Sequence, residues 1–432
     1  MIIVDKALEK AESDGKPIRV GIFGAGYMGR GIALQLLDRK PGLRLVGLAS
    51  RRVQCAQDAL REMGTNDFLN VSNAPDFQQA VSRGLVAVTD DPTLLCRSGN
   101  VDVVIDATSD IEAGARFVLD ALQHGKHTIL LNAVLDATIG PILKTYADRN
   151  NVIISYIDGD EPGVAVNLFR FVKTIGYRPV AAGNLKGFLN HYRTPETQRA
   201  FAERVKQTPE MITSFADGTK LSMECTILAN ATGLKIGKRG MYGPQCANVK
   251  DASGLFPMDQ LLNGGLVDYL LGAEPGTGVF VIGYNDHPIK SQYMNFFKMG
   301  DGPLYTFYTP FHLPQVQMLT TIARAALFHD ATATPLGKPV SDVLTLAKRD
   351  LKAGETLDGI GGYTCYGEND NADVAQEGNL LPMGLSEGCR LKREITKDQV
   401  ITSADVVVPE GRLGDKLRAE QNQHFYEAPV AV

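Results

Sequence analysis

The chain has 432 residues and a formal net charge of −5, with 44% hydrophobic and 22% charged residues. This length predicts two or three domains, and the composition excludes a disordered chain. The small negative charge gives no field that would attract a polyanion, so we expect no nucleic-acid partner. We find no apolar run of about eighteen residues and no basic, apolar leader, so we also expect no membrane span and a cytoplasmic location.

Residues 18–157 alternate short apolar runs with helical patterns. The runs predict strands at Ile18–Phe23, Leu43–Ala49, Val101–Ala107, Thr128–Leu131 and Val152–Ile157. Because each run is apolar almost throughout, it suits a parallel sheet that is covered on both faces. Helical patterns lie between the runs at Gly29–Arg39, Val53–Arg61 and Ile111–His124. This series predicts an α/β fold whose residues 1–160 form a Rossmann domain, a doubly wound parallel sheet.

The regular alternation ends after Pro162. Strand candidates at Val180–Phe188, Val279–Tyr284 and Tyr305–Phe311 lie among helices, which predicts an α+β substrate and catalytic domain over residues 161–331. Residues 332–432 contain an internal similarity between Leu346–Leu357 and Leu391–Ile401. This similarity predicts a duplicated hairpin in a small β module, with chance resemblance as the alternative.

A glycine-rich turn joins the first predicted strand to a helix, with the sequence Gly24-Ala25-Gly26-Tyr27-Met28-Gly29. In a dinucleotide-binding turn the first glycine permits the tight turn, the second lets the backbone approach the pyrophosphate, and the third lets the helix pack on the strand. The helix N-terminus then faces the phosphates. We therefore expect this segment to bind NAD(P), and the alternative is a glycine turn without a ligand.

Polar residues at later strand ends extend the predicted cofactor site. The second strand is followed by Ser50-Arg51-Arg52, where NAD-binding proteins carry an acidic residue. A hydroxyl and two guanidinium groups can bind a 2′-phosphate, so we expect NADPH rather than NADH, although the arginines would also suit a solvated helix start. Small and polar residues end the next two predicted strands, namely Ala107, Thr108, Ser109 and Asn132. We expect them to line the nicotinamide ribose, and the alternative is that they cap the helices that follow.

Carboxylates follow the last Rossmann strand and predict the reaction centre. Asp158 and Asp160 alternate, so on an extended strand both would point to one face and could hold Mg²⁺ or Mn²⁺. Lys220 and Glu224 are four residues apart on one helix face. We expect Lys220 to donate a proton to a carbonyl that is being reduced, and Glu224 to be a third metal ligand or to bind a substrate hydroxyl. The alternatives are a solvated acidic loop and a surface ion pair.

Further candidates for the cleft are basic or titratable. Lys186 follows the first strand of the second domain, and His191 and His312 lie after strands, where they would bind an anionic group or serve a purely structural role. Glu161 directly follows Asp160 and is a further catalytic candidate. The predicted catalytic residues are therefore Lys220, Lys186 and Glu161, and the predicted metal ligands are Asp158, Asp160 and Glu224.

Five motifs together resemble a known family: GAGYMG, IDATS, LLNAV, DGTKLSMECTILANATG and AKRDLKAGETLD. They resemble the homoserine dehydrogenase-like oxidoreductases with a C-terminal SAF-type β-clip module, among them the 1-deoxy-D-xylulose 5-phosphate reductoisomerase-like enzymes. The reductoisomerase resemblance implies NADPH, a divalent metal on Asp158, Asp160 and Glu224, and the rearrangement and reduction of a sugar phosphate. The homoserine dehydrogenase resemblance implies that Lys220 is the acid for hydride transfer and that no metal is needed.

The leading hypothesis is therefore the NADPH-dependent reduction, or reductive isomerisation, of a small polyhydroxylated carbonyl compound or sugar phosphate. A metal-independent alcohol dehydrogenase for a hydroxy acid or amino-acid-like substrate is the main alternative, and a metal requirement separates the two. A third hypothesis is an NADP-binding sensor or scaffold without chemistry. We expect a small-molecule substrate and a homo-oligomer.

Overall fold

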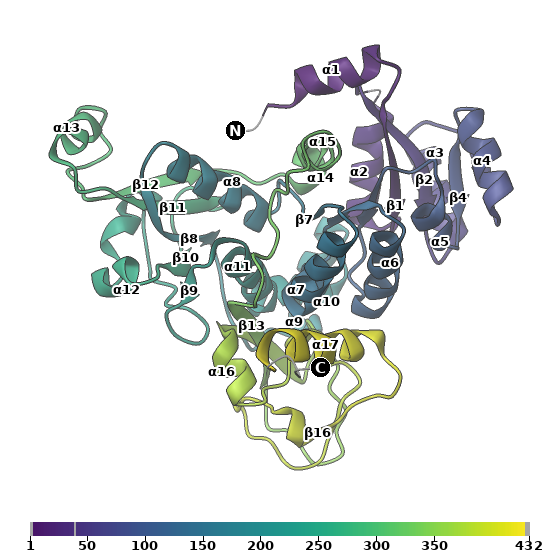
Figure 1. The fold of residues 1–432 in the computed structure, drawn as a ribbon. Helices are drawn as coiled ribbons and strands as arrows, with labels where there is room; N and C mark the ends of the chain where they lie inside the picture. The colour runs from purple at the N-terminus through teal and green to yellow at the C-terminus, as the bar shows by residue number, and fades with distance from the viewer. Residues whose placement is uncertain (1–2, 39, 428–432) are drawn as a thin grey trace.

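The computed structural model describes residues 3–38 and 40–427. Its first domain contains a seven-stranded parallel sheet with the order β3-β4-β2-β1-β5-β6-β7 (Figure 1). The strands are β1 (Ile18–Phe23), β2 (Leu43–Ala49), β3 (Phe68–Asn70), β4 (Val86–Thr89), β5 (Val103–Asp106), β6 (His127–Leu130) and β7 (Ile154–Tyr156). The α/β expectation is confirmed, and β3 and β4 are additional strands that are too short to give a clear apolar run. The strand order reverses between β1 and β5, which is where such sheets bind ligands.

Helices cover both faces of this sheet. They are α1 (Asp5–Ser13), α2 (Tyr27–Leu37), α3 (Val53–Glu62), α4 (Ala74–Ser82), α5 (Thr93–Arg97), α6 (Ile111–Gln123) and α7 (Ala133–Arg149). Every residue of β4, β5 and β7 is buried. The apolar runs that predicted the strands therefore reflect burial on two faces.

The second domain is built on a mixed five-stranded sheet with the order β12-β11-β8-β10-β9. Its strands are β8 (Arg178–Lys186), β9 (Lys235–Ile236), β10 (Leu266–Leu271), β11 (Val279–Tyr284) and β12 (Leu304–Thr309). Its helices are α8 (Glu161–Thr174), α9 (Pro195–Val205), α10 (Pro209–Ala216), α11 (Thr219–Thr232), α12 (Met258–Leu262) and α13 (Pro288–Phe296). Strand β8 is parallel to β10 and antiparallel to β11, so the α+β expectation holds.

The last part of the segment 161–331, which the sequence assigns to the second domain, packs against the first domain. Helix α14 (Pro314–Gln317) packs on α2, and α15 (Leu319–Phe328) packs on β1, β6 and β7 (Figure 1). Further on, Tyr156 N donates to Ala333 O at 2.7 Å, so the chain passes the end of β7 again before the last module. The two large domains are thus joined by two crossings of the chain.

The last module follows this second crossing. It contains the antiparallel pair β13 (Ser341–Ala347) and β14 (Cys365–Asn371), helix α16 (Ala372–Glu377), and the short pair β15 (Arg390–Leu391) and β16 (Val406–Val407). Helix α17 (Leu413–Tyr426) then lies against α6 and α7 of the first domain. The module contacts α7 of the Rossmann domain through β13 and the short turn Met383–Leu385 as well as through this final helix.

The two similar segments of this module pair with each other, whereas the sequence predicted a separate hairpin for each. Leu351 N donates to Ile395 O at 2.8 Å, and Ile395 N donates to Leu351 O at 3.0 Å. The two residues occupy equivalent positions in the duplicated sequence, so a local two-fold axis passes between them. Gly354 and Asp398 are also equivalent, and both have positive φ, +86° and +64°. The internal similarity is thus a real structural repeat.

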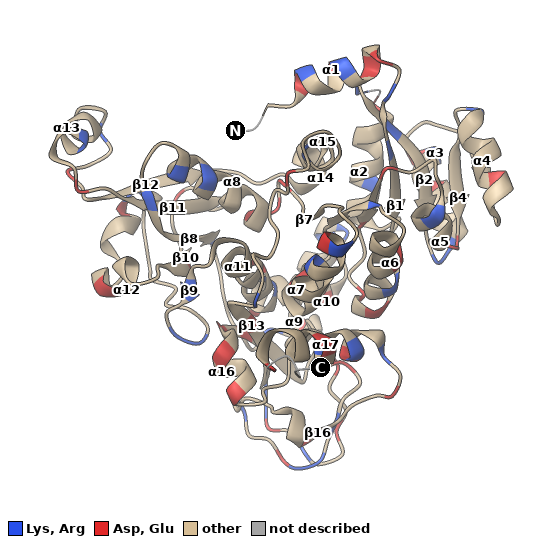
Figure 2. Ribbon diagram, in the orientation of Figure 1, with Lys and Arg blue, Asp and Glu red and all other residues tan. Residues whose placement is uncertain are grey.

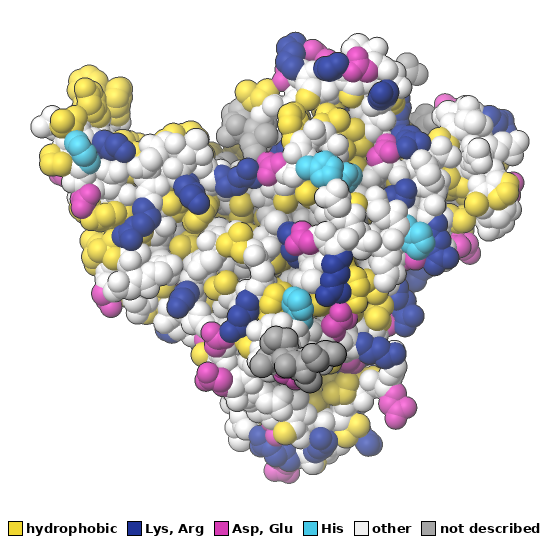
Figure 3. Space-filling view, viewed as in Figure 1, with side chains coloured by type: hydrophobic (Ala, Val, Ile, Leu, Met, Phe, Trp, Pro, Cys, Tyr) yellow, Lys and Arg dark blue, Asp and Glu magenta, His cyan; other side chains and the backbone are white. Residues whose placement is uncertain are grey.

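The surface mixes charges and carries one apolar projection. Figure 2 shows acidic and basic residues interspersed along most helices. Helix α13 has no buried residue, and Ile289, Tyr293, Phe296 and Phe297 on and beside it are each more than half exposed, forming the apolar projection at the upper left of Figure 3. Among the described residues, no helix combines the length and the hydropathy that crossing a bilayer requires.

Candidate active site

The glycine-rich turn has the geometry of a dinucleotide-binding turn. Gly24 has φ +116°, and a Cβ on it would lie 2.7 Å from Ala107 O. A Cβ on Gly29 would overlap the carbonyl oxygen of Gly24, whereas a Cβ on Gly26 would meet open space. Gly26 is the N-cap of α2, and no side chain caps that helix. This geometry is what the roles predicted for the three glycines require, and the free helix N-terminus can receive a pyrophosphate.

The residues after β2 lie where a cofactor ribose would be expected. Ser50 N donates to Thr89 O, which fixes the start of the segment, and Arg52 is the N-cap of α3. Arg51 and Arg52 are both exposed, and the nearest acidic group to Arg51 is Asp110 at 3.7 Å. Two guanidinium groups are therefore available at the carboxyl end of β2, as binding of a 2′-phosphate would require.

The ends of β5 and β6 are joined by a buried polar network. Asp106 accepts hydrogen bonds from the backbone and hydroxyl groups of Thr108, at 3.0 and 2.7 Å, and from Asn132 Nδ2 at 3.1 Å. Burial raises the pKa of Asp106, and these hydrogen bonds oppose the shift. Asn132 also caps α7 by accepting from Leu135 N at 3.1 Å. Asn132 is buried and fully used in the network, whereas Ser109 is exposed at the sheet edge.

Lys220 lies at the centre of a buried carboxylate cluster between the two domains. Its Nζ is 3.3 Å from Asp160 Oδ2, at the N-terminus of α8, and 3.1 Å from Glu224 Oε1, one turn along α11. Tyr156 at the end of β7 donates to Asp160 at 2.5 Å. Burial by itself would lower the pKa of Lys220, but the surrounding carboxylates outweigh it and hold this pKa well above its usual value. Lys220 is therefore a fixed ammonium group.

The pKa values of two carboxyl groups around this ammonium are shifted in opposite directions. Burial would raise the pKa of Asp160, but Lys220 and a hydrogen bond with Glu161 bring it down to about 2. Burial and then the charges of Glu224 and Asp160 raise the pKa of Glu161 well above its ordinary value. Asp160 is therefore ionised and Glu161 holds a proton at neutral pH. The predicted catalytic carboxyl Glu161 is thus in its acid form.

Other polar groups complete the cluster. His312 Nδ1 lies 3.3 Å from Glu161 Oε2, and burial lowers the pKa of this imidazole. Asn184 of β8 donates to Glu224 Oε2 at 2.9 Å. Burial raises the pKa of Glu224, which the positive charges of Lys220 and Lys186 oppose. The predicted residues Lys186, Lys220, Glu161, Glu224 and His312 are thus brought into one site.

The metal-ligand set predicted from the sequence is not assembled as expected. Residues 158–160 form a turn with Gly159 at φ +91°, so Asp158 and Asp160 do not share the face of an extended strand. Asp158 instead accepts from Thr320 Oγ1 at 2.6 Å and from Gly159 N at 2.8 Å. The cation between Asp160 and Glu224 is the Lys220 ammonium, and this set therefore does not fit a metal ion. Within residues 3–38 and 40–427, the one trio with metal-ligand spacing is Asp160, Glu161 and His312.

His191 lies outside the cluster. It stacks on Tyr366, its Nδ1 lies 2.8 Å from Asp217 O, and its Nε2 lies 3.4 Å from Glu368. It therefore connects the second domain to the C-terminal module. Beside it, Lys348 and Asp217 form a fully buried ion pair at 2.9 Å.

Sequence reasoning missed two members of the cluster. They are Tyr156, in the predicted strand Val152–Ile157, and Asn184, in the predicted strand Val180–Phe188, and the sequence patterns assign neither of them a role. A polar residue in a buried strand is itself a signal, because its burial is costly unless it has a partner. Asn184 Oδ1 is buried with no hydrogen-bond partner among the described residues, so this amide retains an acceptor close to Glu224.

Two protein-family models match adjoining parts of the chain. The NAD-binding domain of homoserine dehydrogenase matches residues 24–156, and the catalytic domain of oxidoreductase DRL matches residues 159–318. Homoserine dehydrogenases from Neisseria gonorrhoeae and Bacillus subtilis are 25% and 26% identical over 219 and 141 residues, or 47% and 33% of this chain. These stretches span 44% and 29% of the two relatives, so the chain matches less than half of their length.

Two dehydrogenases are among the solved structures to which the chain is similar. A homoserine dehydrogenase from Thiobacillus denitrificans has a TM-score of 0.42 at 17% identity and covers 79% of this chain and 84% of its own. A probable dehydrogenase from Thermotoga maritima has a TM-score of 0.42 at 13% identity, with 74% and 91% covered. The two family models place the large domains of this chain in the class of NAD(P)-dependent oxidoreductases. Within that class, residues 24–156 are similar to the NAD-binding domain of homoserine dehydrogenase.

Proposed function

We propose that the protein is an NADPH-dependent, metal-independent oxidoreductase that interconverts a carbonyl group and an alcohol on a small hydroxy-acid-like, amino-acid-like or polyhydroxylated compound. The observation that carries this proposal is the Lys220 ammonium, held between Asp160 and Glu224 at the junction of the two domains. NADPH supplies the hydride to the carbonyl carbon when it is bound. The residues of the chain then need to provide only charge stabilisation and a proton.

Lys220 suits both tasks. A fixed ammonium group stabilises the negative charge that develops on the carbonyl oxygen as hydride arrives. An alkoxide is a much stronger base than an amine, so transfer of the proton from Nζ to oxygen is downhill even though the pKa of Lys220 is raised. In the oxidative direction the neutral amine takes the proton back. Glu161 holds a second proton in the same cluster because of its raised pKa.

The same cation supports the metal-independent form over reductive isomerisation. A divalent ion placed between Asp160 and Glu224 would have to displace or repel the Lys220 ammonium, which already neutralises them. The SAF-type assignment of residues 332–432 remains a prediction. The homo-oligomer and the cytoplasmic location remain predictions, and sedimentation of the purified chain tests the first.

The test is NADPH oxidation against a panel of ketoses, sugar phosphates and semialdehydes, each with added Mg²⁺ and with a chelator. We expect turnover of at least one compound that is unchanged by the chelator. Loss of all turnover on chelation would restore the reductoisomerase reading. Tight NADPH binding without any turnover would instead support a sensor or scaffold, and turnover with NADH alone would contradict the assignment of Arg51 and Arg52.

A further inference from the structure

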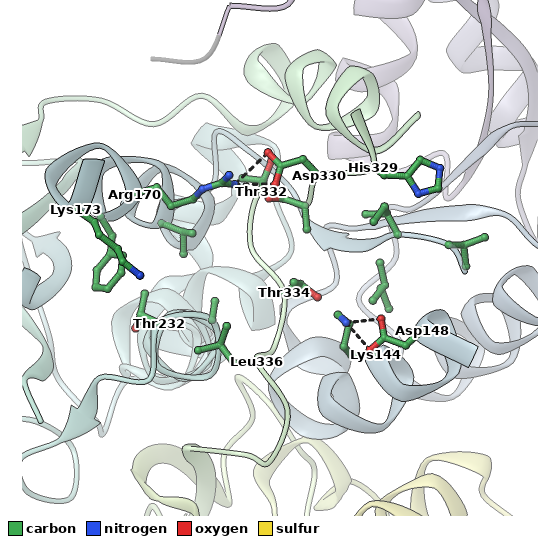
Figure 4. A pocket seen from close by; sticks show the side chains of 17 residues that line it. Lys144, Asp148, Arg170, Lys173, Thr232, His329, Asp330, Thr332, Thr334 and Leu336 are labelled. Carbon is green, nitrogen blue, oxygen red and sulfur yellow. Dashed lines mark hydrogen bonds and ion pairs between the residues drawn. The ribbon is translucent and has the colours of Figure 1, made fainter. Parts of the chain in front are cut away.

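A second pocket, away from the candidate active site, lies between the two large domains. It has a volume of about 420 Å³ and is lined by side chains from α7, α8, α11, the start of β7 and residues 329–336 (Figure 4). The lining includes Val152 and Ile154 at the amino end of β7, whereas Asp160 follows the carboxyl end of that strand. The pocket therefore lies at the amino end of β7, and the Lys220 cluster lies at the carboxyl end of the same strand. This volume is within the range of small-molecule sites.

The charges around the pocket leave one cation unneutralised. Lys144 is paired with Asp148, and Arg170 with Asp330, as the dashed lines in Figure 4 show. Lys173 of α8 lines the same pocket and stands outside both pairs. The two paired cations thus contribute little net charge, and the exposed Lys173 ammonium gives the pocket a net attraction for a single negative charge.

Much of the remaining lining is apolar, and one of its hydroxyl groups lacks a partner among the described residues. Val166 and Phe169 of α8 and Ala231 of α11 form an apolar wall with Val152 and Ile154. Thr334 also lines the pocket, and its Oγ1 is buried without a hydrogen-bond partner among the described residues. Buried hydroxyl groups are usually paired, so this oxygen marks a position where a ligand atom would be accommodated.

We propose that this pocket is a binding site for a small monocarboxylate with an apolar body. Lys173 would bind the carboxylate, the apolar wall would cover the hydrocarbon, and Thr334 would form a hydrogen bond with a ligand oxygen. This proposal does not depend on the proposed reaction. It differs from the cofactor site, whose glycine turn and arginines suit phosphate groups.

The position of the pocket lets a bound ligand influence the active site through two helices that contribute residues to both. Helix α8 carries Glu161 at its N-terminus and Lys173 near its C-terminus, and α11 carries Lys220 and Glu224 near its N-terminus and Ala231 near its C-terminus. A ligand in the pocket would hold the far ends of these two helices against α7 of the first domain. Binding there would favour one arrangement of the two domains by its difference in affinity for each arrangement.

The test is isothermal titration calorimetry of the full chain with hexanoate, benzoate and phenylacetate, and with the amide of each acid. We expect saturable binding of at least one acid with a Kd below about 1 mM. The matching amide should bind at least about tenfold more weakly, since it lacks the charge that Lys173 recognises. Saturating NADPH should not displace the acid, because the two sites are separate.

Three variants locate the site. Lys173→Gln should weaken binding about tenfold, and the matched control Lys416→Gln, which changes an exposed lysine on α17, should leave it unchanged. Ala231→Leu should block the pocket and abolish binding without a change in charge. Circular dichroism verifies that each variant is folded. The proposal is overturned if no acid binds saturably at about 10 mM, if acids and amides bind equally, if NADPH displaces the acid, or if Lys173→Gln and Ala231→Leu bind as the wild type does.

Discussion

The ammonium of Lys220 lies 3.1 Å from Glu224 Oε1, and both side chains come from the first two turns of α11. Asp160 approaches the same nitrogen from the N-terminus of α8 at 3.3 Å. A lysine that is paired on two sides inside the protein is held in position at little entropic cost during the reaction. This is the preorganisation that stabilisation of a developing oxyanion requires.

We predict that Lys220→Met lowers turnover about a hundredfold to ten-thousandfold, because it removes both the positive charge and the proton donor. NADPH affinity, measured by fluorescence titration, should remain within about threefold of the wild type, since Lys220 lies apart from the glycine turn. Lys235→Met, at an exposed lysine on β9, is the matched control and should keep full turnover. Equal turnover in wild type and Lys220→Met would remove Lys220 from the mechanism.

The first domain and its cofactor turn could be predicted because their signals are local. The longer strands of this doubly covered parallel sheet are apolar runs, and the bounds of β1 and β2 agree with the sequence prediction. Gly29 contacts Gly24 within the turn itself, which the turn sequence already implies, whereas the contact of Gly24 is with Ala107, just after β5.

The reaction centre could be predicted only in part because it is assembled by tertiary contacts. The helical spacing of Lys220 and Glu224 predicted that they share a face, but no local pattern shows that Asp160, sixty residues earlier, meets them. The expectation for Asp158 failed because Gly159 turns the chain, and periodicity arguments assume an extended strand. His312 enters the site only because the chain crosses back between the domains.

Asp136 provides a test of pH dependence. Burial raises its pKa from 3.8 to about 7, so the folded chain keeps a proton that the unfolded chain releases. The unfolding free energy should therefore fall as pH rises from about 4 to about 7, and level off above that. Asp136→Asn removes this penalty, and we expect it to raise the unfolding free energy by about 2 to 4 kcal/mol near pH 8, at about 1.4 kcal/mol per pKa unit.

Urea unfolding near pH 8 and near pH 4.5 measures this difference. The gain from Asp136→Asn should shrink to about 1 kcal/mol at the lower pH, which lies within one unit of the ordinary pKa of 3.8, so release of the proton on unfolding contributes little free energy. The exposed Glu377→Gln is the control and should show no pH-dependent difference. A gain of equal size at both pH values would contradict the burial argument.

Substitutions at two glycines of the turn should distinguish an effect on stability from an effect on cofactor binding. Gly29→Ala places a methyl group against the carbonyl oxygen of Gly24, so we expect a lower melting temperature as well as loss of cofactor binding. Gly26→Ala meets no protein atom within 4 Å, so the apo protein should keep its melting temperature. The added methyl would nevertheless occupy the approach of the pyrophosphate and weaken NADPH binding at least about tenfold. Unchanged NADPH affinity in Gly26→Ala would show that the dinucleotide does not lie over this turn.

The preference between the two nicotinamide cofactors depends on Arg51 and Arg52. Both are exposed at the carboxyl end of β2, where the 2′ position of the adenosine ribose is expected. We predict that Arg51→Ala and Arg52→Ala each raise the KM for NADPH at least about fivefold, because each removes a charge-assisted hydrogen bond to the phosphate. The KM for NADH, which lacks that phosphate, should change less than about twofold in the same variants. Arg83→Ala, at an exposed arginine after α4, controls for the general effect of surface charge on a polyanionic ligand. Equal increases for both cofactors would mean that the arginines contact a part of the dinucleotide that NADH and NADPH share.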